Sequence, residues 1–120
     1  MATVLPLVVD GRLTGTVFAV GAAGNKVYFA TVFHNVSGAE NNLELAVPSH
    51  QGDCARVQEY PVYRAPTIHV NLSHVDPFSD IAILVSEGVD GFILPRIENS
   101  SYNFAVGDSV VILGYPFAVL

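Results

Sequence analysis

Turn-forming residues divide the chain into short β-rich segments, and this spacing constrains the fold more than any other feature of the sequence. Gly, Pro, Asn and Asp recur about every eight to twelve residues, and Val, Ile, Phe, Tyr and Thr dominate between them. No long segment shows the helical period that would compete with this pattern. We therefore predict an all-β fold with strands at residues 4–9, 13–20, 26–33, 43–48, 56–62, 67–71, 80–85 and 109–113.

Two of these segments indicate how the strands are packed. Residues 27–33 are apolar at nearly every position, which predicts a strand covered on both sides, whereas residues 43–45 alternate and predict one wet face. A small closed barrel satisfies both demands. The chain has 120 residues, the size of one domain, and contains no repeat or interdomain linker. Residues 1–120 are therefore expected to form a single β-barrel domain.

The charge balance and hydropathy exclude several partners. Five Lys and Arg face eleven Asp and Glu, a net charge of −6, which argues against binding the phosphate backbone of nucleic acid. No apolar run approaches the roughly 20 residues of a membrane span, and no export signal precedes residue 10, so the default location is cytoplasmic. Charged residues make up only 13% of a chain that stops on an apolar run. The chain therefore looks cut, with apolar surface that faces another body.

Metal and cofactor chemistry finds no support in the sequence. Cys54 is the single cysteine, so neither an internal disulfide nor a zinc site with two thiolates is available. The histidines at 50, 69 and 74 lack ligand spacing, and we interpret His50, His69 and His74 as surface or strand-end residues. Residues 21–26 lack the Gly-Lys-Ser/Thr of a phosphate loop, and no two glutamates are paired as in a glycosidase. We predict no metal and no cofactor.

His34 and Asp80 are the residues most suited to carry chemistry. His34 stands between an apolar strand and a turn, and Asp80 stands immediately before another apolar strand. Each has an ordinary structural interpretation, as a strand-edge histidine held by backbone groups and as a turn or capping aspartate. Alternatively, the Asp80 carboxylate accepts a hydrogen bond from Nδ1–H of His34, which fixes the tautomer that leaves Nε2 free as a base.

Four segments, in order along the chain, carry a resemblance to a known family. Residues 14–20 (TGTVFAV) are similar to a Gly-x-Gly-Phe strand with Val17 at the second glycine, and residues 30–36 (ATVFHNV) to a Thr-x-x-His-x-Val segment. Residues 79–84 (SDIAIL) are similar to Asp-Ile/Leu-Ala-x-Leu, and residues 106–117 to Gly-Asp-x-Val-x-x-x-Gly-x-Pro. The chain thus resembles the trypsin-like (chymotrypsin-fold) serine peptidases, in particular the compact bacterial-type members that include the HtrA-like ones.

The resemblance covers nearly the whole chain from about residue 7, but only the first of the two barrels of such an enzyme. It implies a single antiparallel six-stranded Greek-key β-barrel, closed by residues 106–117, with His34 as general base and Asp80 as the acid that orients it. The nucleophile of the family lies on the second barrel in a Gly-x-Ser-Gly-Gly loop, which is absent here. Ser109 follows Gly-Asp but precedes Val110, and Ser37 leads into Gly38, so we interpret both as turn residues.

The leading hypothesis is therefore the N-terminal half of a trypsin-like serine endopeptidase, inactive alone because members of a triad act as a unit. Its partners would be the missing C-terminal barrel or a second copy of the chain, and a protein or peptide substrate in the parent enzyme. The alternative is a non-catalytic β-barrel that binds a partner or self-associates. A third possibility, a barrel unrelated to peptidases, requires His34 and Asp80 to lie far apart.

Overall fold

The described part of the chain contains six β-strands and one short 3-10 helix. The computed structural model describes residues 4–38, 42–47, 66–88, 105–110 and 112–114. The elements, in chain order, are β1 (Val4–Val9), β2 (Arg12–Ala23), β3 (Lys26–Val32), η1 (Phe33–Asn35), β4 (Leu43–Ala46), β5 (Thr67–Asp76) and β6 (Ile81–Glu87). The described residues include no helix with the length and hydropathy needed to cross a bilayer.

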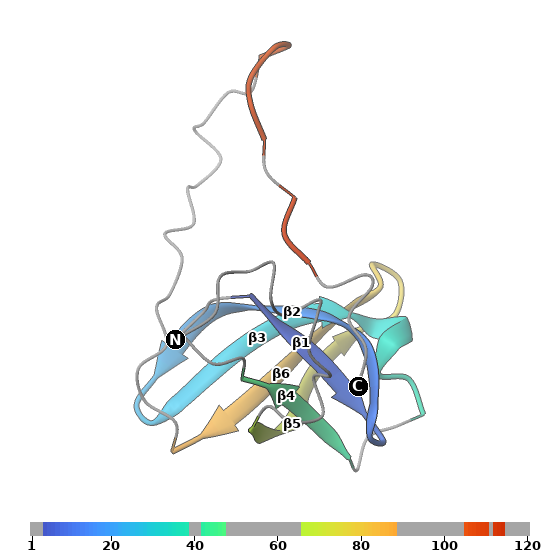
Figure 1. Cartoon of the computed structure of the whole chain (residues 1–120), viewed down its shortest axis with the longest axis vertical. Helices are drawn as coiled ribbons and strands as arrows, with labels where there is room; N and C mark the ends of the chain where they lie inside the picture. The colour runs from blue at the N-terminus through green and yellow to red at the C-terminus, as the bar shows by residue number, and fades with distance from the viewer. Residues whose placement is uncertain (1–3, 39–41, 48–65, 89–104, 111, 115–120) are drawn as a thin grey trace.

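The strands form one closed antiparallel barrel, as predicted (Figure 1). Their order around the barrel is β1-β2-β3-β6-β5-β4, and β4 pairs with β1 to close the ring. Within this order β4 lies beside β1, followed by β2 and β3, which is the Greek-key arrangement. The all-β class and the six-stranded antiparallel barrel are therefore confirmed. Closure leaves no open sheet edge along the ring, which removes the usual template for aggregation.

Alternating side chains from the strands fill the barrel. Strands β3 and β6 share one burial pattern, in which every second residue points inward and is buried. Phe29 is the largest fully buried side chain, with no exposed surface, and it packs among aliphatic residues from the other strands. Those neighbours in the core include Leu5, Leu7, Val17, Leu43, Leu45, Val70, Ala82 and Leu84. The strand period of two thus produces one apolar interior.

Several boundaries differ from the prediction. Strand β5 continues five residues beyond the predicted end at Asn71, because it pairs with β6 as far as Asp76. The strand predicted to include Phe33 ends at Val32, where the chain turns into η1. Asp80, expected to open a strand, belongs to the preceding turn. The predicted strand at 56–62 lies outside the described residues.

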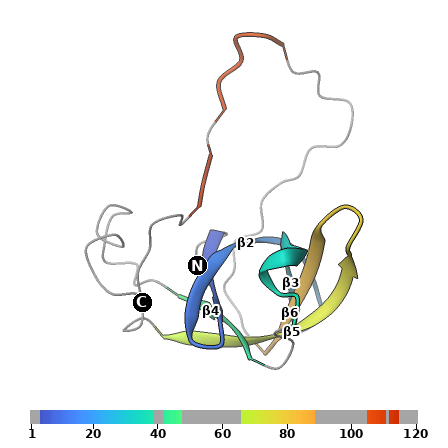
Figure 2. The same ribbon diagram turned by 90° about the vertical axis from the view of Figure 1, so that its right-hand side faces the viewer.

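The predicted strand at 109–113 is wrong for the residues that are described there. Residues 109, 110, 112 and 113 form no strand, and the barrel closes without them. Figures 1 and 2 show this segment away from the barrel, and its apolar side chains, Val110, Ile112 and Leu113, are exposed. Apolar residues form a strand only where a neighbouring strand supplies hydrogen bonds, and the ring of six strands is already complete.

Strand β3 is not covered on both sides, contrary to expectation. Its inward residues are buried, but Tyr28 and Ala30 are only half-buried and Val32 is 38% exposed. The outward residues of β6 follow the same trend, since Ile83 is half-buried and Ile81 is 46% exposed. The apolar side chains of β3 and β6 therefore fall into two sets. The inward set fills the barrel, and the outward set forms an apolar surface on the outside.

Candidate functional site

The turn that carries His34 is fixed by backbone hydrogen bonds and by one buried anchor. It follows β3 directly, and the amides of Val36 and Ser37 both donate to the Phe33 carbonyl at 3.0 Å. Val36 is completely buried in the core, and Phe33 packs against that core. The alternation of apolar residues around His34 thus anchors η1 at the end of the barrel while the His34 side chain stays exposed.

Asp80 ends the turn between β5 and β6. Asp76 begins this turn, and its Oδ1 accepts hydrogen bonds from the amides of Phe78 and Ser79. The backbone of Asp80 has φ = 55°, in the left-handed region that Asp and Asn adopt more readily than other non-glycine residues. Because the end of β3 and the start of β6 lie side by side, with Val32 opposite Ile81, the turn places Asp80 next to η1, in contact with Phe33 and His34.

Three hydrogen bonds join Asp80 to the turn. Its carbonyl accepts from the Phe33 amide at 3.0 Å, and its Oδ1 accepts from the His34 amide at 2.8 Å. Its Oδ2 lies 2.6 Å from Nδ1 of the His34 imidazole. The structure thus shows the contact that the second of the two interpretations requires, between residues 46 positions apart.

This geometry defines what the pair can do chemically. A carboxylate is an acceptor, so its contact with Nδ1 favours the tautomer with the proton on Nδ1 and the lone pair on Nε2. The His34 side chain is 71% exposed, and no group among the described residues hydrogen-bonds Nε2. The arrangement can therefore take a proton from a group outside the barrel, and the adjacent carboxylate stabilises the imidazolium that results.

The same contact changes the acidity of Asp80. The pKa of its carboxyl lies below the ordinary value of 3.8, chiefly because the His34 side chain hydrogen-bonds the ionised form and further because the His34 amide does. Ionised Asp80 thus stabilises the folded chain above the unfolded-state pKa, and that contribution is lost as the pH falls through the lower folded-state pKa.

The stability difference between the wild type and Asp80→Asn is therefore expected to depend on pH. The asparagine variant should be less stable at about pH 5, and the difference should shrink as the pH falls below about 4. Urea midpoints of both proteins, measured at pH values between about 6 and 2.5, provide the test. A difference that stays the same over this range would show that the Asp80 carboxylate is not stabilised by the fold.

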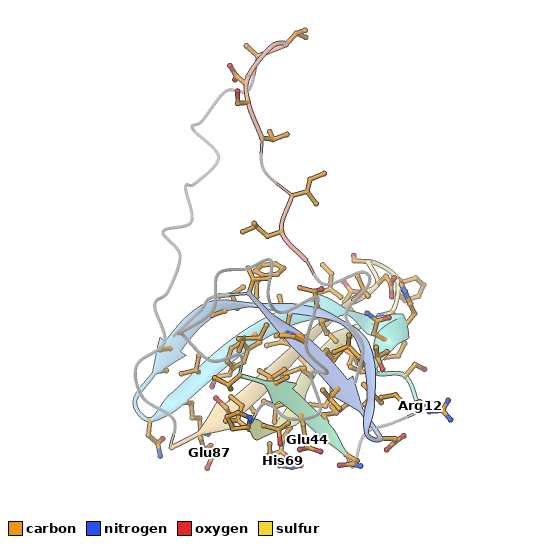
Figure 3. All side chains as sticks on the ribbon, viewed as in Figure 1. Arg12, Glu44, His69 and Glu87 are labelled. Carbon is orange, nitrogen blue, oxygen red and sulfur yellow. The ribbon has the colours of Figure 1, made fainter. Side chains whose placement is uncertain are left out.

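The other candidate residues do not join the site. His74 is held by its neighbour, with Nδ1 at 2.8 Å from Ser73 Oγ. His69 lies opposite Glu44 on the outside of β4 and β5, as Figure 3 shows. Ser37 lies in the turn after η1 and Ser109 in the exposed segment off the barrel. His50 and Cys54 lie outside the described residues. No group of three metal-ligating side chains occurs in the described ranges.

An apolar surface extends from the site along the outside of the barrel. Phe18 on β2 is 48% exposed and lies opposite Ala30 of β3, while Val32 of β3 lies opposite Ile81 of β6. We call this the outer face, formed by Phe18, Tyr28, Ala30, Val32, Ile81, Ile83 and Val85. At the end far from Asp80 the outer face is bordered by a second charged pair, Lys26 and Glu87, with Nζ and Oε1 3.7 Å apart.

Sequence reasoning missed two features around the site. It did not foresee that the His34 amide, as well as the ring, would bind Asp80, because a strand-to-helix turn at Phe33 leaves no distinctive residue pattern. It also did not identify the outer face, although apolar residues at both parities of β3 and β6 were a usable signal. The sequence matches no protein-family model and no curated protein.

Proposed function

We propose that this barrel is the first half of a trypsin-like serine endopeptidase, in which His34 is the general base and Asp80 orients it. The observation that carries the proposal is the hydrogen bond from His34 Nδ1 to Asp80 Oδ2 at 2.6 Å, on a pair whose Nε2 is open to an outside group. The serine and the oxyanion hole come from a second barrel. The reaction is peptide-bond hydrolysis through an acyl-enzyme.

The backbone contacts of Asp80 add support. A general base must stay oriented while it gains and loses a proton, and orientation by one rotatable side chain would be weak. Here Asp80 accepts hydrogen bonds from the amides of Phe33 and His34 as well as from the His34 imidazole. The imidazole is therefore set relative to the backbone of η1, and η1 is anchored in the core by Val36.

A fluorophosphonate probe, which reacts with activated serines, tests the proposal. A chain that continues past Leu120 with Gly-x-Ser-Gly-Gly is expected to be labelled at that serine, whereas the 120-residue chain is not. His34→Ala should abolish labelling and peptide hydrolysis of the longer chain. His74→Ala is the matched control, because His74 is also exposed but its ring hydrogen-bonds Ser73 and not a carboxylate, and it should keep both activities.

Two outcomes would contradict the proposal. One is a longer chain whose serine is labelled equally well with and without His34. The other is a folded longer chain with the Gly-x-Ser-Gly-Gly sequence that neither reacts with the probe nor cleaves peptides. In either case the non-catalytic binding module becomes the better hypothesis, with the His34 and Asp80 contact as a structural clasp between η1 and the β5–β6 turn.

The outer face supplies the partner surface in this proposal. It begins beside Asp80 and presents apolar side chains from three adjacent strands, whereas the outside of a barrel in water is usually polar. In the peptidase a second barrel packs there. In the 120-residue chain a second copy takes its place, since association is the simplest way to remove this surface from water.

The 120-residue chain is therefore expected to be a dimer at micromolar concentration, as measured by sedimentation velocity. Phe18→Ser removes the most exposed aromatic ring of the outer face and should shift the protein toward monomer. Val110→Ser is the control, because Val110 is 74% exposed but lies in the segment off the barrel. A wild-type monomer, or a dimer that only Val110→Ser disrupts, would contradict dimerisation through the outer face.

A further inference from the structure

Gly15 and Asn35 form the closest packing contact described around a glycine of this chain. A Cβ atom added to Gly15 would lie closer to Nδ2 of Asn35 than real Cβ atoms come to a neighbour, and a tight 3.2 Å from its Cγ, so the Asn35 side chain would have to shift. At six other glycines such an atom would meet nothing within 4 Å: Gly11, Gly21, Gly24, Gly38, Gly88 and Gly107. The Asn35 amide thus fits into the space that the missing side chain of Gly15 leaves on β2.

The backbone does not explain this glycine. Gly15 lies within β2, paired with Leu7 of β1, and it does not have the positive φ that glycine alone adopts easily, unlike Gly11 or Gly24. A glycine in the middle of a strand costs stability relative to a residue with a side chain. What Gly15 provides is room, and the group that uses the room is Asn35.

The contact between Asn35 and Gly15 matters because Asn35 lies next to His34 in η1. Asn35 is the last residue of η1 and follows His34 directly; its side chain contacts Gly15 of β2, while the His34 ring contacts Asp80. The turn is then held from two directions: β2 contacts it through Asn35, and the β5–β6 turn contacts it through Asp80. Without the first contact, the turn is held by its own backbone hydrogen bonds, by the packing of Phe33 and Val36, and by the Asp80 hydrogen bonds.

We propose that Asn35, seated on Gly15, is a positioning residue that holds η1 so that Nδ1 of His34 meets Asp80. The catalytic importance of Asn35 rests on the proposed function. The contact of Asn35 with Gly15, and its effect on the His34–Asp80 hydrogen bond, do not depend on that function. Asn35 touches neither substrate nor nucleophile in this proposal; it acts through the backbone of the turn.

The test follows the His34–Asp80 hydrogen bond in the folded 120-residue chain by NMR. The readouts are the downfield proton resonance of His34 Nδ1–H and the titration of the Asp80 carboxyl. Gly15→Ala is expected to displace the Asn35 side chain from β2 and so loosen η1, to weaken or remove the Nδ1–H resonance, and to bring the Asp80 midpoint up toward its ordinary value of 3.8. Gly21→Ala is the matched control, a β2 glycine with nothing within 4 Å, and it should change neither readout.

Two further variants separate positioning from a general loss of stability. Asn35→Ala introduces no clash, so it keeps the proposal testable even if Gly15→Ala does not fold, and it should weaken the Nδ1–H resonance by loosening the turn. Gly15→Ala combined with Asn35→Ala replaces the amide by a methyl group at the same place and should recover the wild-type readouts at least in part.

Two results would overturn the inference. Unchanged readouts in folded Asn35→Ala would show that the turn is held without this side chain. Equal changes in Gly15→Ala and Gly21→Ala would show a general effect of added bulk on β2. Because none of these readouts needs peptidase activity, they are independent of the serine-labelling experiment. A positive NMR result with no labelled serine would retain the contact and reject only the catalytic role.

Discussion

Asp80→Asn is expected to lower kcat by about 10⁴-fold in a peptidase built on this barrel, with the barrel still folded. The substitution keeps the size of the side chain and the oxygen that accepts from the His34 amide. It replaces the oxygen that faces Nδ1 by an NH₂ group, which donates hydrogen bonds and cannot accept them. The imidazole then places its proton on Nε2, where the lone pair of the base is needed.

The backbone of Asp80 makes asparagine the informative replacement. At φ = 55° an alanine would be strained, so Asp80→Ala would combine loss of the carboxylate with a change in the turn. Asparagine adopts the left-handed region about as readily as aspartate. A loss of activity in Asp80→Asn is therefore attributable to the tautomer of His34 and to the missing charge beside the imidazolium.

Asp10→Asn is the matched control for this prediction. Asp10 also has a positive φ, 51°, in the turn between β1 and β2, but its carboxylate does not contact His34. It should leave kcat within a factor of about two, because the substitution leaves the hydrogen bonds between Asp80 and His34 unchanged. Steady-state kinetics of the longer chain provide the comparison. A loss in Asp80→Asn of less than about tenfold would mean that Asp80 does not set the tautomer of a catalytic base.

Particular residues show why the sequence predicts the barrel so well. The inward residues of β3 and β6 repeat at a period of two, and turn residues such as Gly11 and Gly24 separate strands that pair directly. This information is local, because burial and turn formation depend on neighbours in sequence. Closure then follows, since six short strands with an apolar side have few other ways to cover it.

The site is less predictable because its contacts are long-range and depend on backbone geometry. The pairing of His34 with Asp80 followed from a likeness in residue pattern, and neither residue alone distinguishes it from an ordinary turn. The contact of Asn35 with Gly15 depends on the direction that the chain takes after β3. That direction is set by the 3-10 turn that begins at Phe33. A bend of this kind leaves no periodic signal in the sequence.

The strand predicted at 109–113 shows the opposite error. Its apolar residues favour a β-strand by propensity, but propensity describes a residue that fits a half-buried pleated surface. In the structure Val110 and Ile112 have no such surface beside them and remain exposed. The same residues are expected to pair as a strand only where another part of the assembly supplies the neighbouring strand.

Phe29→Ala is expected to destabilise the barrel by about 3–5 kcal/mol, the largest effect on stability of any substitution considered for this chain. Phe29 is the largest side chain with no exposure, and it fills the middle of β3, between β2 and β6. Its removal loses the transfer free energy of the ring and leaves a cavity that a closed barrel cannot collapse to fill. Because domains of this size are stable by only about 5–15 kcal/mol, the variant should be partly unfolded near body temperature.

Phe18→Ala provides the control for ring burial in the same pair of strands. Phe18 lies one strand away and is 48% exposed, so its loss should cost about 1 kcal/mol or less once dimerisation is suppressed by dilution. Phe29→Leu should recover more than half of the loss, because it refills most of the cavity. The free energies of unfolding come from urea denaturation followed by circular dichroism. Equal losses for Phe18→Ala and Phe29→Ala would contradict a barrel packed around Phe29, and with it the rigid frame that holds His34 against Asp80.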